Sequence, residues 1–416
     1  MPVPSPFHPR TAALCESLLW KEWAGYHAVR AYDTAFEREY QAFRHSAGLL
    51  DVTPLFKYEV RGRDAGAFLA WVSVKDPRRL ADGQVTYLCW CDERGGVLDD
   101  GTITRFGEER YRMTSADPSF AWLERHTDGF EVTIEDVSEA LGALALQGPR
   151  SRDVLVAATG GALADLGFFR AGAARIAGVP VDVTRTGYTG DLGYEIWCPA
   201  NRALDVWDAL VDAGAPHRLL PAGLDALDVT RVEAGFILAG VDYTSARRAL
   251  IDEQRSSPFE IGLGWTVKLE REPFLSQRAL IRERERKGGK RLVGLEIDWD
   301  ELEALYDAKD LPPALDAHAW RSSIPLYDGG AQVGYATSGA WSPTLKKNLA
   351  LATVLARYEP LGTRLEMEWT VEHERHRVGA VVVRRPFFDP PRKRASGDPP
   401  RKRGSGDPPR ERSSAT

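Results

Sequence analysis

The sequence predicts a protein of the α+β class with a separate β-rich domain near its C-terminal end. Residues 118–198 mix helical and strand patterns, which is typical of an α+β domain. Residues 83–115 alternate apolar and polar side chains between glycine-bearing turns, and this pattern predicts a three-stranded meander. After Gly289, short strand-like segments recur at even spacing, which predicts either a barrel or a sandwich.

The N-terminal residues 11–50 have the apolar spacing of helices. Thr11 is placed to cap a helix over Ala12–Trp20, and an amphipathic helix is expected over Tyr32–Arg44. The same signals predict further helices at Asp64–Trp71, Pro118–His126, Asn201–Ala213, Gly223–Ala234 and Ser276–Lys287. Within the C-terminal domain, the acidic segment Asp298–Arg321 is expected to be a helical insertion.

The composition limits the class of protein. The 416 residues suggest two or three domains, and 43% hydrophobic residues allow a large core. The formal net charge is -6 although the end of the chain is rich in arginine, so the body is acidic, which argues against nucleic acid as the main partner. The four cysteines show no regular spacing, and no apolar run reaches about 18 residues. We therefore expect a soluble, cytoplasmic protein without disulfides or membrane spans.

Two stretches near the C-terminus are expected to lack a site. From Asp389 the motif Asp-Pro-Pro-Arg repeats at Asp398 and Asp407, and this proline- and arginine-rich composition predicts a disordered tail over 389–416. His373 and His376 lie three residues apart in a predicted strand or turn, so their side chains would point to opposite sides. We expect no metal site there.

The glycine-rich stretch 185–196, Arg-Thr-Gly-Tyr-Thr-Gly-Asp-Leu-Gly-Tyr-Glu-Ile, is the most informative part of the chain. Alternating apolar residues on both sides predict a strand, a glycine-rich turn and a second strand. Glu195 lies between Tyr194 and Ile196 in the second strand. A buried carboxylate costs several kcal/mol unless it is paired or hydrogen-bonded. Either Glu195 faces water, or it serves a binding site.

A second unusual feature is the pair Asp99 and Asp100 within a predicted strand. Aspartate is disfavoured in strands, and the alternation of side chains places the two carboxylates on opposite faces. One of them should therefore face the core or a cleft. A bulge or an Asx turn after Gly95 and Gly96 is the alternative explanation.

Together, these stretches resemble the aminomethyltransferase family, the T-protein of the glycine cleavage system and its relatives. The motifs that match are Arg-Thr-Gly-Tyr-Thr-Gly-Asp-Leu-Gly-Tyr-Glu, Gly-Gly-x-x-Asp-Asp, Arg-x-Glu-Ala-Gly and Thr-Ser-Gly-x-x-Ser-Pro-Thr-Leu. The resemblance covers about residues 10–388. It implies a body of two intertwined α+β domains over 1–288 and a C-terminal β-barrel over 289–388, arranged around a central cavity.

The resemblance also implies a ligand and roles for five residues. The cofactor would be tetrahydrofolate, whose pterin ring the carboxylate of Glu195 would grip. Asp100 would be the catalytic residue, because a carboxylate near an amine can relay a proton and stabilise a developing cation. Tyr87 and Tyr188 would line the folate site, although either could be a core aromatic residue. Arg231, in the Arg-x-Glu-Ala-Gly motif, would also bind the cofactor.

Three departures from the family pattern leave the reaction open. Pro54 stands where glycine cleavage enzymes usually have histidine, Leu227 stands where they have an arginine that touches folate, and the insertion at 298–321 is extra. The expected function is transfer of a methylene or methyl unit from a donor onto tetrahydrofolate, with the aminomethyl group of a lipoyl carrier protein as one donor. The alternative donor is a free methylated amine, methoxy or methylsulfonio compound. A non-enzymatic iron–sulfur assembly factor would need a cysteine motif after the Arg231 helix, and no cysteine follows Cys198.

Overall fold

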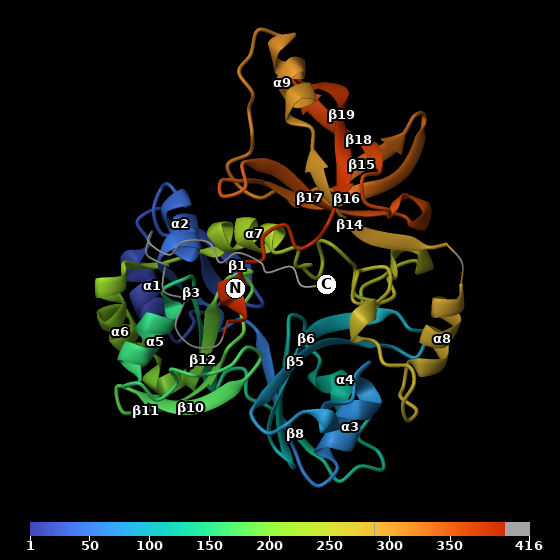
Figure 1. Cartoon of the computed structure of the whole chain (residues 1–416). Coiled ribbons are helices and arrows are strands. Elements are labelled where there is room, and N and C mark those ends of the chain that lie inside the picture. Colours follow the sequence, from blue (N-terminus) through green and yellow to red (C-terminus); the bar gives the residue numbers. More distant parts are fainter. Residues whose placement is uncertain (287, 396–416) are drawn as a thin grey trace, which may run out of the picture.

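The computed structural model describes residues 1–286 and 288–395, and it consists of three parts arranged around a common centre (Figure 1). Two parts are built on open β-sheets, and the third is a closed β-barrel. The chain enters the first sheet at Ala47, builds the second sheet over 56–136, and then returns to the first. The predicted α+β class, the intertwined domains and the barrel are confirmed, whereas a cavity at the centre stays a prediction.

The first part is a six-stranded sheet with helices on both faces. Its strand order is β10-β11-β12-β9-β3-β13. Helices α5 and α6 pack on one face, and α2 and α7 pack on the other, because side chains along each strand alternate between two hydrophobic clusters. The elements are α1 His8–Leu14, β1 Leu19–Trp23, β2 Tyr26–Ala31, α2 Glu37–His45, β3 Ala47–Asp51, β9 Leu141–Gln147, α5 Ser151–Ala158, β10 Ala171–Ile176, β11 Val179–Thr184, β12 Gly193–Pro199, α6 Ala203–Gly214, β13 Leu219–Pro221 and α7 Leu224–Glu233.

The expected helix over Ala12–Trp20 is wrong. Helix α1 ends at Leu14, and Leu19–Trp23 pairs with β2 as an antiparallel hairpin. Proline near the start of α1 sets its first turn, and positive φ at Leu18 and Ala24 redirects the chain. The first strand has an exposed or half-exposed side chain at every position, so it lacks the period-two apolar pattern by which strands are recognised.

The second part is a five-stranded sheet with the order β5-β6-β7-β4-β8, and its first three strands confirm the predicted meander. Helix α3 packs into its core with segments from the 261–280 region. The elements are β4 Phe56–Arg61, α3 Ala65–Val72, β5 Gln84–Cys91, β6 Val97–Gly107, β7 Arg110–Ser115, α4 Phe120–Glu124, β8 Thr133–Asp136 and α8 Gln277–Glu285.

The third part is a closed six-stranded barrel with the order β14-β17-β16-β15-β18-β19. Valine, leucine and alanine side chains from all six strands fill its interior. The barrel alternative is therefore correct, and the sandwich is not. The strands are β14 Lys290–Ile297, β15 Ile324–Asp328, β16 Ala331–Ser342, β17 Lys347–Leu355, β18 Arg364–Val371 and β19 Glu374–Val383.

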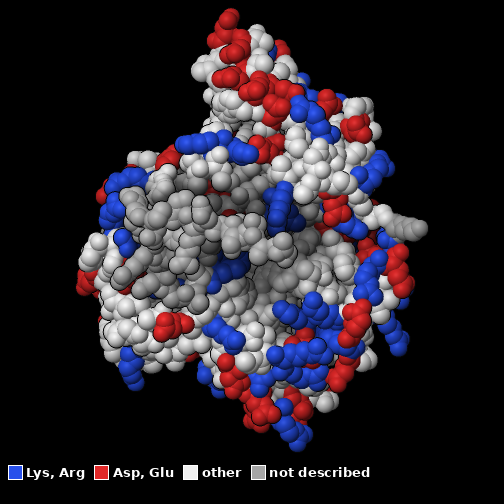
Figure 2. Space-filling view, in the orientation of Figure 1, with Lys and Arg blue, Asp and Glu red and all other residues white. Residues whose placement is uncertain are grey.

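The insertion between β14 and β15 is helical only in its first part. Helix α9, Trp299–Asp307, begins at Asp298, whose carboxylate accepts a hydrogen bond from the N–H of Glu301. The rest of the insertion has no further helix, and its two prolines at 312 and 313 explain why the helix does not continue. Figure 2 shows acidic side chains gathered over the tip of the molecule that α9 forms.

The predicted start of the disordered tail, at residue 389, is too early in the chain. Residues 389–395 contain a short 3-10 turn, Pro391–Lys393, and contact the body through the ion pair of Arg392 with Asp191. A buried carboxylate on the body therefore anchors the start of this segment. Residues 396–416, which hold the rest of the predicted tail, lie outside the described residues. Among the described helices, none is long and apolar enough to cross a membrane.

Candidate functional site

Two adjacent strands of the second sheet bring Asp100 and Tyr87 together. Asp100 on β6 lies opposite Cys89 on β5, so Asp100 and Tyr87 project from the same face of the strand pair. The hydroxyl of Tyr87 donates a 2.5 Å hydrogen bond to Oδ2 of Asp100. The ring of Tyr87 stacks on Trp265, whose indole is 61% exposed. Two of the predicted residues are therefore in direct contact beside an exposed aromatic surface.

The other oxygen of Asp100 is held by Tyr243, a residue that sequence reasoning missed. Tyr243 lies in the loop after α7, is buried, and donates a 2.5 Å hydrogen bond to Oδ1. The two residues are 143 positions apart, so no local spacing could have linked them. The only available signal was that Tyr243 follows closely on the Arg-Val-Glu-Ala-Gly motif.

The environment of Asp100 differs from that of its neighbour. Burial raises the pKa of Asp100, and the hydrogen bonds from Tyr243 and Tyr87 oppose this rise. The backbone N–H groups of Ala116 and Asp117 donate to Oδ2 of Asp99, and the hydroxyl of Tyr243 also lies 3.4 Å from its Oδ1. Asp99 thus fixes the chain after β7, whereas Asp100 lies between two phenols. That the two carboxylates face opposite sides of the strand stays a prediction.

Glu195 lies in the middle of β12 on the other sheet. Tyr194 and Ile196 face the α5 and α6 side, so Glu195 shares with Trp197 the face that α7 covers. Its Oε2 accepts a 2.5 Å hydrogen bond from the hydroxyl of Thr186. In the described part of the chain, no cation pairs with Glu195 and no donor reaches its Oε1. Burial raises the pKa of this carboxyl.

Tyr188 and Arg231 are both anchored to the chain that follows α7. The hydroxyl of Tyr188 donates to the carbonyl of Ile237, and its ring stacks on Phe236 at 5.5 Å. Arg231 donates to the carbonyl of Phe236 at 3.3 Å. Tyr188 from the glycine-rich turn and Arg231 from α7 therefore both contact Phe236.

Arg231 is buried in a network of charges. It donates to Asp228 and Asp242, in each case at 2.7 Å, and is 1% exposed. Its Nη2 has no hydrogen-bond partner among the described residues. Asp242 also accepts from the hydroxyls of Thr337 and Ser338. Asp242, which sequence reasoning also missed, thus joins α7 to the barrel, and the Thr-Ser-Gly motif on β16 supplies this junction.

Four of the five predicted residues therefore gather around the loop 236–243. Tyr87 contacts Asp100, Tyr243 links Asp100 to this loop, and Tyr188 and Arg231 hold its first residues. Glu195 has no hydrogen bond to the other four. It lies on the face of the six-stranded sheet that α7 covers.

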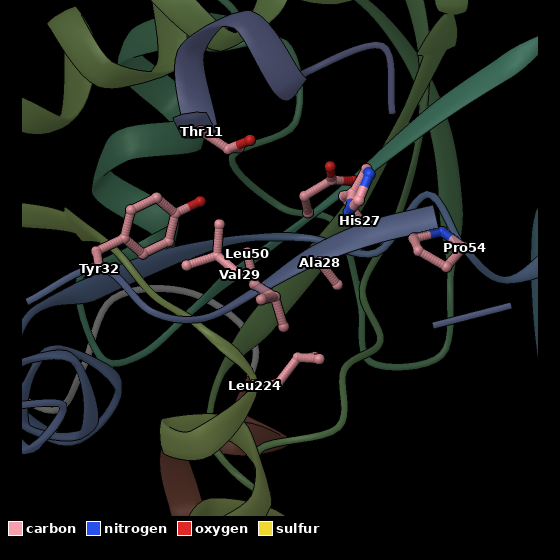
Figure 3. Close-up of a pocket in the computed structure, with 9 residues that line it drawn as sticks. Thr11, His27, Ala28, Val29, Tyr32, Leu50, Pro54 and Leu224 are labelled. Atoms are coloured by element: carbon pink, nitrogen blue, oxygen red, sulfur yellow. The ribbon is translucent and has the colours of Figure 1, made fainter. Parts of the chain in front are cut away.

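Pro54 lies apart from this cluster. It lines a small cavity of about 10 Å³ with His27 and Asp51, on the side of β2 and β3 (Figure 3). This volume holds about one water molecule. Leu227 is partly buried and packs, with Ala319 of the insertion, on the hydrophobic cluster below α7. Both residues therefore border the same hydrophobic cluster, which also contains residues of α7.

Two family profiles match almost the whole chain. The GCVT N-terminal domain matches residues 8–271, and the glycine cleavage T-protein C-terminal barrel domain matches residues 290–389. The chain belongs to the glycine cleavage T-protein family. The members of this family are tetrahydrofolate-dependent one-carbon transferases, and the predicted resemblance is confirmed.

Relatives of two kinds share about a third of the sequence. An aminomethyltransferase of Halalkalibacterium halodurans is 36% identical over 361 residues, covering 85% of this chain and 90% of the relative. A trimethylamine-oxide aldolase of Ruegeria pomeroyi is 35% identical over 402 residues, covering 93% of this chain. The chain matches only 47% of that aldolase's length.

A solved structure supports the same fold. The glycine cleavage system aminomethyltransferase T of Bartonella henselae has a TM-score of 0.80 and 25% sequence identity to this chain. The similarity covers 96% of this chain and all of that one. The arrangement of the two sheets and the barrel is therefore that of the T-protein.

Proposed function

We propose that this T-protein family member transfers a methylene or methyl unit from a one-carbon donor onto tetrahydrofolate, with Asp100 as the catalytic residue. The observation that supports this function most directly is the position of Asp100 between the hydroxyls of Tyr87 and Tyr243. A carboxylate held at both oxygens has a fixed orientation, which proton transfer requires.

The residues present suit a folate. A pterin ring offers a row of N–H donors, and Glu195 is a carboxylate with a free oxygen and no paired cation in the described chain. Two charge-assisted bonds to such an edge are worth about 1.5–3 kcal/mol each. Arg231 is a buried guanidinium with one unpaired nitrogen, so it suits a carbonyl oxygen. We assign these two residues, with Tyr188, to cofactor binding.

Tetrahydrofolate, when bound, supplies a nucleophilic nitrogen that accepts the one-carbon unit. Asp100 then accepts the proton that this nitrogen loses. The proton binds to one of the two carboxylate oxygens after the hydrogen bond from Tyr87 or Tyr243 to that oxygen has opened. Because burial raises the pKa of Asp100, its carboxylate is a stronger base than an exposed aspartate. The same negative charge stabilises a cationic one-carbon donor.

The identity of the donor separates two versions of this function. The aminomethyltransferases among the relatives support a donor presented by a lipoyl carrier protein. The trimethylamine-oxide aldolase supports a free methylated amine or amine oxide. Leu227 favours the second version, because its apolar side chain cannot form the charged contact that the family pattern places at this position. We place the enzyme in the cytoplasm, since its four buried cysteines form no disulfide. We assign residues 1–288 to its folate-binding body and residues 289–388 to its barrel domain.

A donor screen tests this function. Wild type and Asp100→Asn are incubated with tetrahydrofolate and trimethylamine N-oxide, dimethylamine, dimethylsulfoniopropionate or an aminomethylated lipoyl carrier, and the folate product is measured by chromatography. Wild type should convert tetrahydrofolate with one donor class, and Asp100→Asn should be slower by about 10²–10⁴-fold, as expected for loss of general base catalysis. Equal product from both proteins would contradict the role of Asp100.

A further inference from the structure

A short segment at the end of the described chain reaches the glycine-rich turn from outside. Residues 388–395, here named the C-terminal clamp, leave the barrel and pass α7 towards the six-stranded sheet (Figure 1). The N–H of Phe388 donates to the carbonyl of Glu233 at the end of α7, at 2.8 Å. Three carbonyls of the clamp accept hydrogen bonds from buried Arg185, those of Arg392, Lys393 and Ala395.

The centre of this contact is the ion pair of Arg392 with Asp191. The guanidinium donates through Nε and Nη2 to the two carboxylate oxygens, each at 2.6 Å. The Asp191 side chain is fully buried and belongs to the turn between β11 and β12. Arg44 lies 3.8 Å from the same carboxylate and donates to the carbonyl of Thr189. A buried carboxylate is stable only with such partners, so the conformation of the turn depends on Arg392.

The clamp also touches the aromatic residues of the site. The ammonium group of Lys393 lies over the ring of Phe236, 5.0 Å from its centre. Phe236 stacks on Tyr188, the tyrosine of the glycine-rich turn. Glu195 lies four residues after Asp191, in β12. The clamp therefore supports the segment that presents Tyr188 and Glu195 directly at Asp191 and, through Phe236, at Tyr188.

We infer that Arg392 is a positioning residue for the folate site, and that the C-terminal clamp holds the turn 186–193 in the conformation that binds the cofactor. This inference rests on the proposed binding of tetrahydrofolate. Arg392 pairs with Asp191 and has no hydrogen bond with Asp100, Tyr87 or Glu195. Its effect on the folate site therefore passes through the turn. Without the clamp the turn becomes mobile while the two sheets and the barrel remain folded.

Two measurements on the full chain test the inference with Arg392→Gln. Hydrogen exchange of the amides in 186–193, measured without ligand, should become at least about fivefold faster, which corresponds to about 1 kcal/mol of lost local stability. Exchange in β17, inside the barrel, should stay unchanged. Calorimetry should show tetrahydrofolate binding weakened by at least about fivefold. Arg392→Lys keeps the charge and should recover part of both effects.

The matched control is Arg394→Gln, which removes a cation from the same segment. Arg394 pairs with Asp389 inside the clamp and is half exposed, so both readouts should match wild type. Unchanged exchange in 186–193 for Arg392→Gln would overturn the inference, as would faster exchange without loss of affinity. If wild type itself binds no tetrahydrofolate, the proposed function and the positioning role fail together. Faster exchange confined to 186–193 would then establish only the clamp's hold on the turn.

Discussion

The hydroxyl of Tyr243 lies 2.5 Å from Oδ1 of Asp100 and joins the loop after α7 to strand β6. This contact connects the two halves of the body, because β6 belongs to the five-stranded sheet and α7 packs on the six-stranded one. The position of the proposed catalytic carboxylate therefore depends on how the two sheets meet.

Removing this hydroxyl should change the pH dependence of the reaction. The hydrogen bond from Tyr243 lowers the pKa of Asp100, against burial, which raises it. Tyr243→Phe therefore raises the pKa further, and the acid limb of the pH–rate profile should move to higher pH, because the base must be ionised. Tyr306→Phe, which loses a hydroxyl in the barrel domain, is the control. An unchanged acid limb in Tyr243→Phe would show that Asp100 is not the base in the rate-limiting proton transfer.

Arg231 should contribute strongly to stability as well as to binding. Its removal leaves the carboxylates of Asp228 and Asp242 without their shared cation in a buried site. Arg231→Ala should lower the free energy of unfolding in urea by about 3–5 kcal/mol. Arg321→Ala breaks the other ion pair of Asp228 from a more exposed position and should cost less than about 1 kcal/mol. Similar losses in both variants would contradict the buried network.

Much of this architecture could be predicted from the sequence because its signals are local. Alternating strands and glycine turns indicate the meander and a C-terminal barrel or sandwich, and helix α7 ends at the predicted place. Asp100 and Glu195 are recognisable from the sequence because carboxylates are disfavoured inside strands, so their presence there indicates a specific role. The hairpin of β1 and β2 was missed because it is largely exposed and lacks an apolar alternation.

Tyr243 and Asp242 could not be predicted for a different reason. Their partners lie on strands about a hundred residues or more away, Asp100 for Tyr243 and Thr337 and Ser338 for Asp242. Contacts of that range are set by the packing of domains, which no spacing rule describes. The start of the tail was misjudged for the same reason. Arg392 is ordered by Asp191, a residue 201 positions before it.

Glu195→Gln should make the protein more stable at neutral pH. Burial raises the pKa of Glu195 in the folded state above its unfolded value. The folded state therefore binds the proton more tightly, and the contribution of Glu195 to stability falls as pH rises through the interval between the two pKa values. Glutamine removes this penalty, so the free energy of unfolding at pH 7.5 should rise by about 1 kcal/mol. The gain should vanish below the unfolded pKa, and a loss at neutral pH would show that Glu195 already has a stabilising partner.

Calorimetric titration of wild type and Glu195→Gln with tetrahydrofolate measures whether Glu195 and its surroundings bind the cofactor. Thr186→Val, which removes the hydroxyl that orients Glu195, serves as an intermediate variant. We expect micromolar binding by wild type and a loss of at least about 1.5 kcal/mol in Glu195→Gln, the value of one charge-assisted bond. Thr186→Val should lie between them. Binding of equal strength in wild type and Glu195→Gln, or no binding by wild type, would show that Glu195 does not hold tetrahydrofolate.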